Sequence, residues 1–168
     1  MPEKRDLTKL EILSIAIKSE IDAKALYTRM KEKVDADDLK QKMDFLIAQE
    51  DRHEVILREV YEKQFPEVEL ALPPKAILPM IDDVLAREAT LKELFEAGMM
   101  AERMAQEFYS DLADRTNDMR AKKTLLYMSN MEESHYAILQ AEWNQIERLN
   151  TEEANEFLDS EGLMFFGP

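Results

Sequence analysis

Two short motifs of the same form, 82 positions apart, constrain the fold of this chain more than any other feature. Residues 50–53 and 132–135 both read Glu-x-x-His, and they contain the only two histidines of the 168-residue sequence. Identical residues recur at the same offset, without a gap, in further pairs that include Thr8 and Thr90, Glu11 and Glu93, Glu20 and Glu102, and Tyr27 and Tyr109. We therefore interpret the chain as two copies of one unit, each contributing two glutamates and one histidine to a shared site.

Apolar side chains recur at alternating spacings of three and four residues through both units, which is the pattern of a helix that buries one face. The pattern predicts a helix from a capping box at Thr8 to about residue 33, and a second from Asp37 or Asp38, as N-cap, to about residue 65. It predicts a third helix from a capping box at Thr90 and a fourth that ends near residue 150. The motif glutamates and histidines stand within the apolar stripes, so we expect them to be buried.

Short connections near residues 34–37 and 116–118 indicate two antiparallel helical hairpins, over residues 8–64 and 90–150. Residues 65–89 contain four prolines and are long enough to cross between the second and third helices; within them, residues 77–88 either form a short helix or begin the third. In the tail, 151–168, we expect a short acidic helix over 151–162 and an apolar end that packs on the body or on a partner subunit. The predicted fold is all-α, a four-helix bundle in a single domain over residues 1–168.

The spacing of the acids brings them to one level of such a bundle. Residue 35, the midpoint of Glu20 and Glu50, lies in the first short connection, so the two acids lie at equal height in their hairpin. Glu102 and Glu132 have their midpoint at residue 117, in the second connection. Within each Glu-x-x-His motif the two side chains share a helix face, one turn apart. Four helices thus direct four carboxylates and two imidazoles to one point.

Such a cluster needs positive charge. Burying an ionised carboxylate without a partner costs several kcal/mol or more, and the neighbouring interior positions offer no lysine or arginine. Two divalent cations would balance four carboxylates, and a Glu and His set without sulfur suits iron or manganese better than calcium or copper. The sequence therefore predicts a two-metal site with six ligands: Glu20, Glu50, His53, Glu102, Glu132 and His135.

Two further residues, Tyr27 and Tyr109, follow the first glutamate of each unit by two helical turns on the same face. They are placed to hydrogen-bond to carboxylates of the site, although aromatic residues at this spacing fit core filling equally well. An alternative interpretation of the whole pattern is a four-helix interaction protein with a vestigial site, whose repeat records only a duplicated bundle. That interpretation leaves four buried acids without an explanation.

Composition excludes several functional classes. With 22 basic and 36 acidic residues the net charge is −14, which repels phosphate backbones and argues against nucleic acid as a partner. The absence of cysteine excludes disulfides, thiolate-bound metal and thiol catalysis. No apolar run approaches the roughly 20 residues of a membrane helix, and no apolar signal region follows the N-terminus. We expect a cytoplasmic protein without a membrane partner.

The ligand pattern of Glu20, Glu50-x-x-His53, Glu102 and Glu132-x-x-His135 resembles that of the ferritin-like di-iron carboxylate superfamily. The resemblance covers about residues 8–145 and is strongest to the rubrerythrin-like branch. It implies a ferritin-like four-helix bundle with a long crossover between helices two and three, and two iron ions as cofactors, with manganese as the other candidate. A homodimer is the expected assembly for such a bundle.

Two departures separate this chain from rubrerythrins proper. Those proteins also carry a rubredoxin-type iron site built from paired Cys-x-x-Cys motifs, whereas this sequence has no cysteine. The resemblance therefore implies an external electron donor. Rubrerythrins also place an extra glutamate three residues after the ligand on the third helix, where this chain has Ala105. That glutamate is linked in the family to peroxide reduction, so its absence indicates a more symmetric site, closer to that of ferritin-like oxidases.

The leading functional hypothesis is a di-iron oxidoreductase that reacts with hydrogen peroxide or dioxygen, in the manner of a rubrerythrin that protects against oxidative stress. The second is an iron-binding ferroxidase without an organic substrate. A di-iron hydroxylase is a third, and it would need an apolar pocket beside the metals, for which Ala23, Gly98 and Ala105 leave room.

Overall fold

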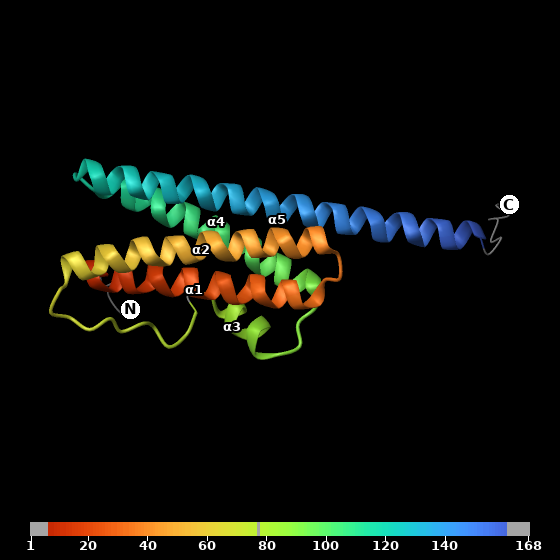
Figure 1. Ribbon diagram of the computed structural model, residues 1–168, viewed down its shortest axis with the longest axis horizontal. Helices are drawn as coiled ribbons and strands as arrows, with labels where there is room; N and C mark the ends of the chain where they lie inside the picture. Colours follow the sequence, from red (N-terminus) through yellow and green to blue (C-terminus); the bar gives the residue numbers. More distant parts are fainter. Residues whose placement is uncertain (1–6, 77, 161–168) are drawn as a thin grey trace, which may run out of the picture.

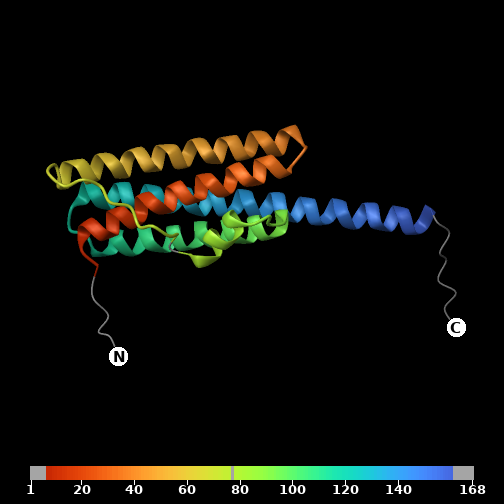
Figure 2. The ribbon, with the colours of Figure 1, turned by 90° about the horizontal axis from the view of Figure 1, so that it is seen from below.

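The computed structural model describes residues 7–76 and 78–160, and it is helical throughout its regular elements. Within these residues the helices are α1 (Lys9–Lys33), α2 (Asp37–Gln64), α3 (Pro79–Ala86), α4 (Leu91–Arg115) and α5 (Met119–Ser160). Four long helices lie side by side, α3 lies beside the bundle, and α5 continues past the ends of the other helices (Figures 1 and 2). The predicted all-α, ferritin-like bundle is confirmed.

The two hairpins pack unevenly against each other. α1 packs closely on α2, and α4 packs closely on α5, as the short connections require. Between the hairpins, α1 contacts α4 extensively, whereas α2 and α5 touch at few points. The crossover runs along the outside of the bundle and delivers α3 against α1 and α4 (Figure 2).

Both hairpins begin with the same capping box. The Thr8 hydroxyl accepts a hydrogen bond of 3.2 Å from the Glu11 backbone N–H, and the Glu11 carboxylate accepts one of 2.9 Å from the Thr8 N–H. In α4 the Thr90 hydroxyl accepts from the Glu93 N–H at 3.2 Å, and Glu93 accepts from the Thr90 N–H at 2.8 Å. These reciprocal bonds satisfy N–H groups that helix starts leave unpaired, and they fix both starts as the sequence predicts.

Two helix boundaries differ from the predictions. Ala36, rather than Asp37 or Asp38, is the N-cap of α2, and it makes no side-chain hydrogen bond. Both aspartates lie instead in the first helical turn, where a negative charge interacts favourably with the helix dipole. The predicted end near residue 150 is also wrong, because α5 continues to Ser160. Residues 150–160 contain no glycine or proline that would interrupt a helix.

In the crossover, the prediction of a short helix within residues 77–88 corresponds to α3, which begins with Pro79 at the position where its fixed φ and missing N–H cost nothing. The expected packing of the apolar tail, residues 163–168, lies outside the described residues. No helix in the described part of the chain combines the length and apolarity needed to cross a bilayer.

The core consists of two apolar clusters separated by a polar layer. One cluster, which includes Leu26, Met43 and Phe95, lies toward the connection between α1 and α2. The other, which includes Ile17 and Leu57, lies toward the opposite end. The six predicted ligands belong to neither cluster and lie between them in each of the four long helices, so apolar packing closes the polar layer from both ends.

We expect Thr90→Ala to lower the free energy of unfolding by about 1 kcal/mol, because it removes the side-chain acceptor of the α4 cap. Thr124→Ala is the matched control, since Thr124 lies within α5 and bonds only to the Arg120 carbonyl. Urea denaturation of the two variants measures the difference. Equal stability of both variants would show that the cap contributes nothing.

Candidate metal centre

The structure brings all six sequence-predicted ligands together in the middle of the bundle. α1 contributes Glu20 and α4 contributes Glu102, while α2 and α5 each contribute the Glu and His of their motif. Each of the six residues is at most 2% exposed. Because the i and i+3 side chains of a helix share one face, each motif points both of its side chains inward.

The two histidines define two overlapping groups of acids. His53 Nδ1 lies 3.4 Å from Glu20, 3.1 Å from Glu50 and 3.0 Å from Glu132. His135 Nδ1 lies 3.7 Å from Glu102, 2.8 Å from Glu50 and 3.0 Å from Glu132.

Within each group, one ligand atom from every member lies within 4.8 Å of the others. Glu50 and Glu132 belong to both groups, whereas Glu20 and Glu102 belong to one each. This is the arrangement that two neighbouring cations need, with two carboxylates shared between them and one further carboxylate and one imidazole for each.

The two tyrosines connect the hairpins crosswise. Tyr109 of α4 donates a hydrogen bond to Glu20 of α1, and Tyr27 of α1 donates one to Glu102 of α4. Both phenols are buried. Burial, together with the negative charges of Glu20 and Glu132, raises the pKa of Tyr109 well above its ordinary value, so this phenol stays protonated and acts as a donor. Glu20 and Glu102, which we call the outer glutamates, are therefore each held in place by a tyrosine of the opposite hairpin.

Without metal, protons partly neutralise the cluster. Burial raises the pKa of Glu102 to about 8, with the charge of Glu132 adding to the effect and the contact with His135 opposing it. Burial and the neighbouring Glu132 raise the pKa of Glu20 well above its usual range. Burial also acts to raise the pKa of Glu50, but its contacts with both histidines outweigh that effect and lower the pKa to about 2.

The imidazoles respond in the opposite direction. Burial alone would lower the pKa of His53, but its contacts with Glu132, Glu20 and Glu50 raise it to about 12. Burial likewise opposes protonation of His135, yet its surrounding carboxylates raise its pKa to about 12. The site without metal therefore pairs two imidazolium ions with carboxylates. Metal ions would take the place of these protons, because imidazole binds a metal only in its neutral form.

Several buried atoms of the cluster have a charged neighbour but no well-directed hydrogen bond. The buried atoms without a hydrogen bond of acceptable geometry include Glu50 Oε1, both carboxylate oxygens of Glu132, and His135 Nδ1. These are atoms of the shared acids and of an imidazole that faces them. Buried polar atoms are normally hydrogen-bonded. Carboxylate oxygens and an imidazole nitrogen that lack such bonds are suited to bind a metal that prefers oxygen and nitrogen ligands, such as iron or manganese.

One buried acid beside the centre was not singled out by the sequence. Asp22 on α1 is 6% exposed and pairs with Lys18, and its Oδ2 atom has no hydrogen-bond partner. A lysine four residues before an aspartate is a common pattern of an exposed ion pair on a helix, so the sequence contains no signal that Asp22 is buried.

The geometry can be compared with known proteins. The family model for rubrerythrin matches residues 11–143, which is most of the chain. The chain belongs to the rubrerythrin family. This is a ferritin-like di-iron family, so the resemblance inferred from the ligand pattern is confirmed.

Among solved structures, the chain is similar to a hypothetical protein from Pyrococcus furiosus. The two share 28% sequence identity with a TM-score of 0.72, over 88% of this chain and 95% of the other. The match shows that the bundle extends over nearly the whole of that relative. A search of curated proteins gave no match.

We expect the stability of the metal-free protein to fall as the pH rises from about 6.5 to 9. The folded protein holds protons on both histidines up to a pKa of about 12, and on Glu102 up to about 8, whereas the unfolded chain releases them near the ordinary values of 6.5 and 4.5. Because the folded state binds more protons in this range, raising the pH favours unfolding. Urea denaturation across this pH range measures the slope.

Protein loaded with manganese(II) is the control for this measurement. Its bound ions displace the same protons, so the loss of stability above pH 6.5 should shrink or disappear. A metal-free protein whose stability increases between pH 6.5 and 9 would contradict the charge arrangement described here.

Proposed function

We propose that this protein is a di-iron oxidoreductase that reacts with hydrogen peroxide or dioxygen. The observation that carries the proposal is the pair of overlapping ligand groups, in which Glu50 and Glu132 are common to both. Two metals sharing carboxylates can change their oxidation state together while the shared acids adjust to the change in charge. Membership of the rubrerythrin family supports iron as the metal.

The residues have distinct roles in this proposal. Glu20 and His53 would hold one ion and Glu102 and His135 the other, with Glu50 and Glu132 available to both. Two ferrous ions bound by these residues would supply the two electrons that reduce an O–O bond. Tyr27 and Tyr109 keep the outer glutamates oriented through their hydrogen bonds. The apolar clusters on both sides restrict water around the acids.

The reduced state has to be restored by a donor outside the described site. The chain has no cysteine, so it cannot form the thiolate iron site that would pass electrons within one polypeptide. We infer that a separate protein or a small molecule supplies the electrons.

A second candidate is a ferroxidase, in which iron itself is the substrate. The observation that favours it is Ala105, which stands on α4 one turn after Glu102, so no additional carboxylate is provided there. The ligand set is then equal for the two metals, as the repeat predicts. A ferroxidase would oxidise added ferrous iron but would reduce peroxide poorly when supplied with a reductant.

Substitution of the shared and outer glutamates tests the ligand assignment. We expect Glu50→Gln to lose both metals and Glu20→Gln to lose one, because Glu50 belongs to both groups and Glu20 to one. Glu133→Gln is the matched control, since Glu133 lies next to Glu132 but is exposed. Iron per chain is measured by elemental analysis after anaerobic loading and desalting. Two irons retained by Glu50→Gln would refute the assignment.

Reaction of the loaded protein tests the activity. Hydrogen peroxide is added stepwise to the ferrous protein under anaerobic conditions. We expect the near-ultraviolet absorbance of ferric iron to reach its maximum when one equivalent of peroxide per two irons has been added. When a chemical reductant is also present, the protein should consume repeated additions of peroxide catalytically. The Glu50→Gln substitution should lower the rate of peroxide consumption at least about 100-fold, because the metals are lost. Oxidation without catalytic peroxide consumption would favour the ferroxidase. No optical change with either peroxide or oxygen would reject both candidates.

A further inference from the structure

An open groove of about 600 Å³ lies between α2 and α5. Phe45, Ala137, Ile138 and Ala141 form its apolar lining, and Phe45 is 48% exposed. In the described part of the chain, every residue that lines the groove belongs to one of these two helices, whose backbones approach each other at few points. We propose that the groove binds the apolar segment 163–166, with the sequence Leu-Met-Phe-Phe, of a second copy of this chain.

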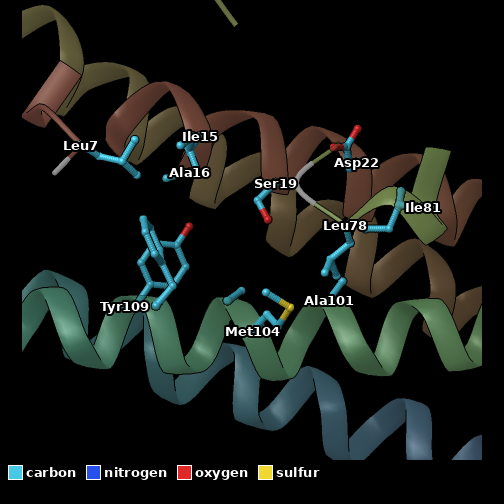
Figure 3. Close-up of a pocket in the computed structure, with 12 residues that line it drawn as sticks. Leu7, Ile15, Ala16, Ser19, Asp22, Leu78, Ile81, Ala101, Met104 and Tyr109 are labelled. Carbon is cyan, nitrogen blue, oxygen red and sulfur yellow. The ribbon is translucent and has the colours of Figure 1, made fainter. Parts of the chain in front are cut away.

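The other face between the hairpins, where α1 meets α4, is covered by the chain itself. A cavity of about 220 Å³ lies there, and Leu78 and Ile81 at the start of α3 close it on the outside (Figure 3). Of the small residues expected to leave room beside the metals, Ala105 lines this cavity, whereas Ala23 and Gly98 do not. The crossover thus covers one face between the hairpins, and no described residue outside α2 and α5 covers the other. An exposed apolar surface of this kind marks an interaction site.

The contacts between α2 and α5 show where the bundle ends along α5. The two helices run antiparallel, and Lys42 pairs with Glu142 beside the groove. Because α2 begins at Asp37, its first residue lies level with about residue 147 of α5. Residues 148–160 therefore project past the bundle (Figures 1 and 2). A rise of about 1.5 Å per residue places Ser160 about 20 Å beyond the end of α2.

This projection keeps segment 163–166 away from the groove of its own chain. The groove lies level with residues 138–141, about 30 Å back along α5 from Ser160. Phe166 follows Ser160 by six residues, and an extended chain spans at most about 3.6 Å per residue, or about 22 Å in all. The segment therefore cannot fill its own groove, whereas a second copy of the chain can bring the same segment to it.

The segment and the groove are also complementary in charge. No charged residue stands between Gly162 and Phe166, and in the groove the charges of Lys42 and Glu142 neutralise each other. Each chain has a net charge of −14, which opposes the association of two copies through their charged surfaces. An apolar, uncharged contact is therefore the favourable way for two copies to associate.

A two-fold axis makes the contact reciprocal, because each copy then donates one segment and accepts one. Aromatic side chains bury about 150–250 Å² each, so Phe165 and Phe166 of both copies together bury about 800 Å². The two grooves lose a similar area. The total is close to the roughly 1,600 Å² of a stable protein–protein interface.

Sedimentation of the full-length protein tests the proposal. We expect the unmodified protein to form a dimer of two 19.6 kDa chains. Phe165→Ser combined with Phe166→Ser should raise the dissociation constant at least about 100-fold, because both aromatic anchors are lost. The matched control is Val68→Ser combined with Met119→Ser. It removes two apolar side chains that are 44% and 65% exposed and lie outside the groove, and it should leave the dimer intact.

A charge placed in the groove tests the other half of the contact. Ala137→Glu introduces a carboxylate at an exposed position of the lining and should dissociate the dimer. Gln140→Glu adds the same charge at an exposed position of α5 outside the lining and should not. Thermal unfolding verifies that every variant folds.

The absence of cysteine allows the contact to be located directly. Gln41 lines the groove, so Gln41→Cys protein mixed with Gly167→Cys protein should form a mixed disulfide in preference to a disulfide within either variant. A monomeric unmodified protein, whose groove would then serve another partner, would overturn the proposal. So would a dimer that survives Ala137→Glu or the loss of both phenylalanines, or the absence of the mixed disulfide. These measurements need no iron, so their outcome is separate from that of the proposed function.

Discussion

The arrangement of this bundle depends on how four buried carboxylates and two buried imidazoles neutralise one another. An isolated carboxylate in this position would cost several kcal/mol or more. Here each acid faces a proton donor or an imidazole, and the shared acids Glu50 and Glu132 face both histidines. The same contacts join α2 and α5, whose backbones approach each other at few points, because Glu50 meets His135 and His53 meets Glu132 between these helices. Ions bound among these groups would strengthen that connection between the hairpins.

The tyrosines make the site a property of both hairpins together. Each outer glutamate comes from one hairpin and receives its hydrogen bond from the tyrosine of the other, across the closely packed α1 and α4 interface. On the opposite side, the shared acids pair with the imidazole of the other hairpin. Each acid also has the histidine of its own hairpin within 3.7 Å, but the complete set of contacts forms only when the two hairpins pack together.

The surroundings of the centre are less symmetric than the centre itself. The six ligands and two tyrosines repeat at one offset, but Asp22 has Met104 as its counterpart, and α5 is much longer than α2. The cavity lies on the α1 and α4 side, where α3 covers it and where Tyr109 connects it to Glu20. A small molecule that enters there would approach one end of a cluster whose two ligand groups are otherwise equivalent.

The sequence by itself determined the helices, the hairpins and the six residues of the site. These features rest on local rules: the apolar periodicity, the Thr-x-x-Glu caps and an offset that puts equivalent residues at equal height. The tertiary structure decided which glutamates are shared and that each tyrosine bonds to the opposite hairpin, because both depend on how the hairpins cross. It also decided the burial of Asp22, whose ion pair with Lys18 has the sequence pattern of an exposed one, and the position of the cavity. The end of α5 was placed too early: residues 150–160 contain no glycine or proline to stop a helix, and α5 continues to Ser160.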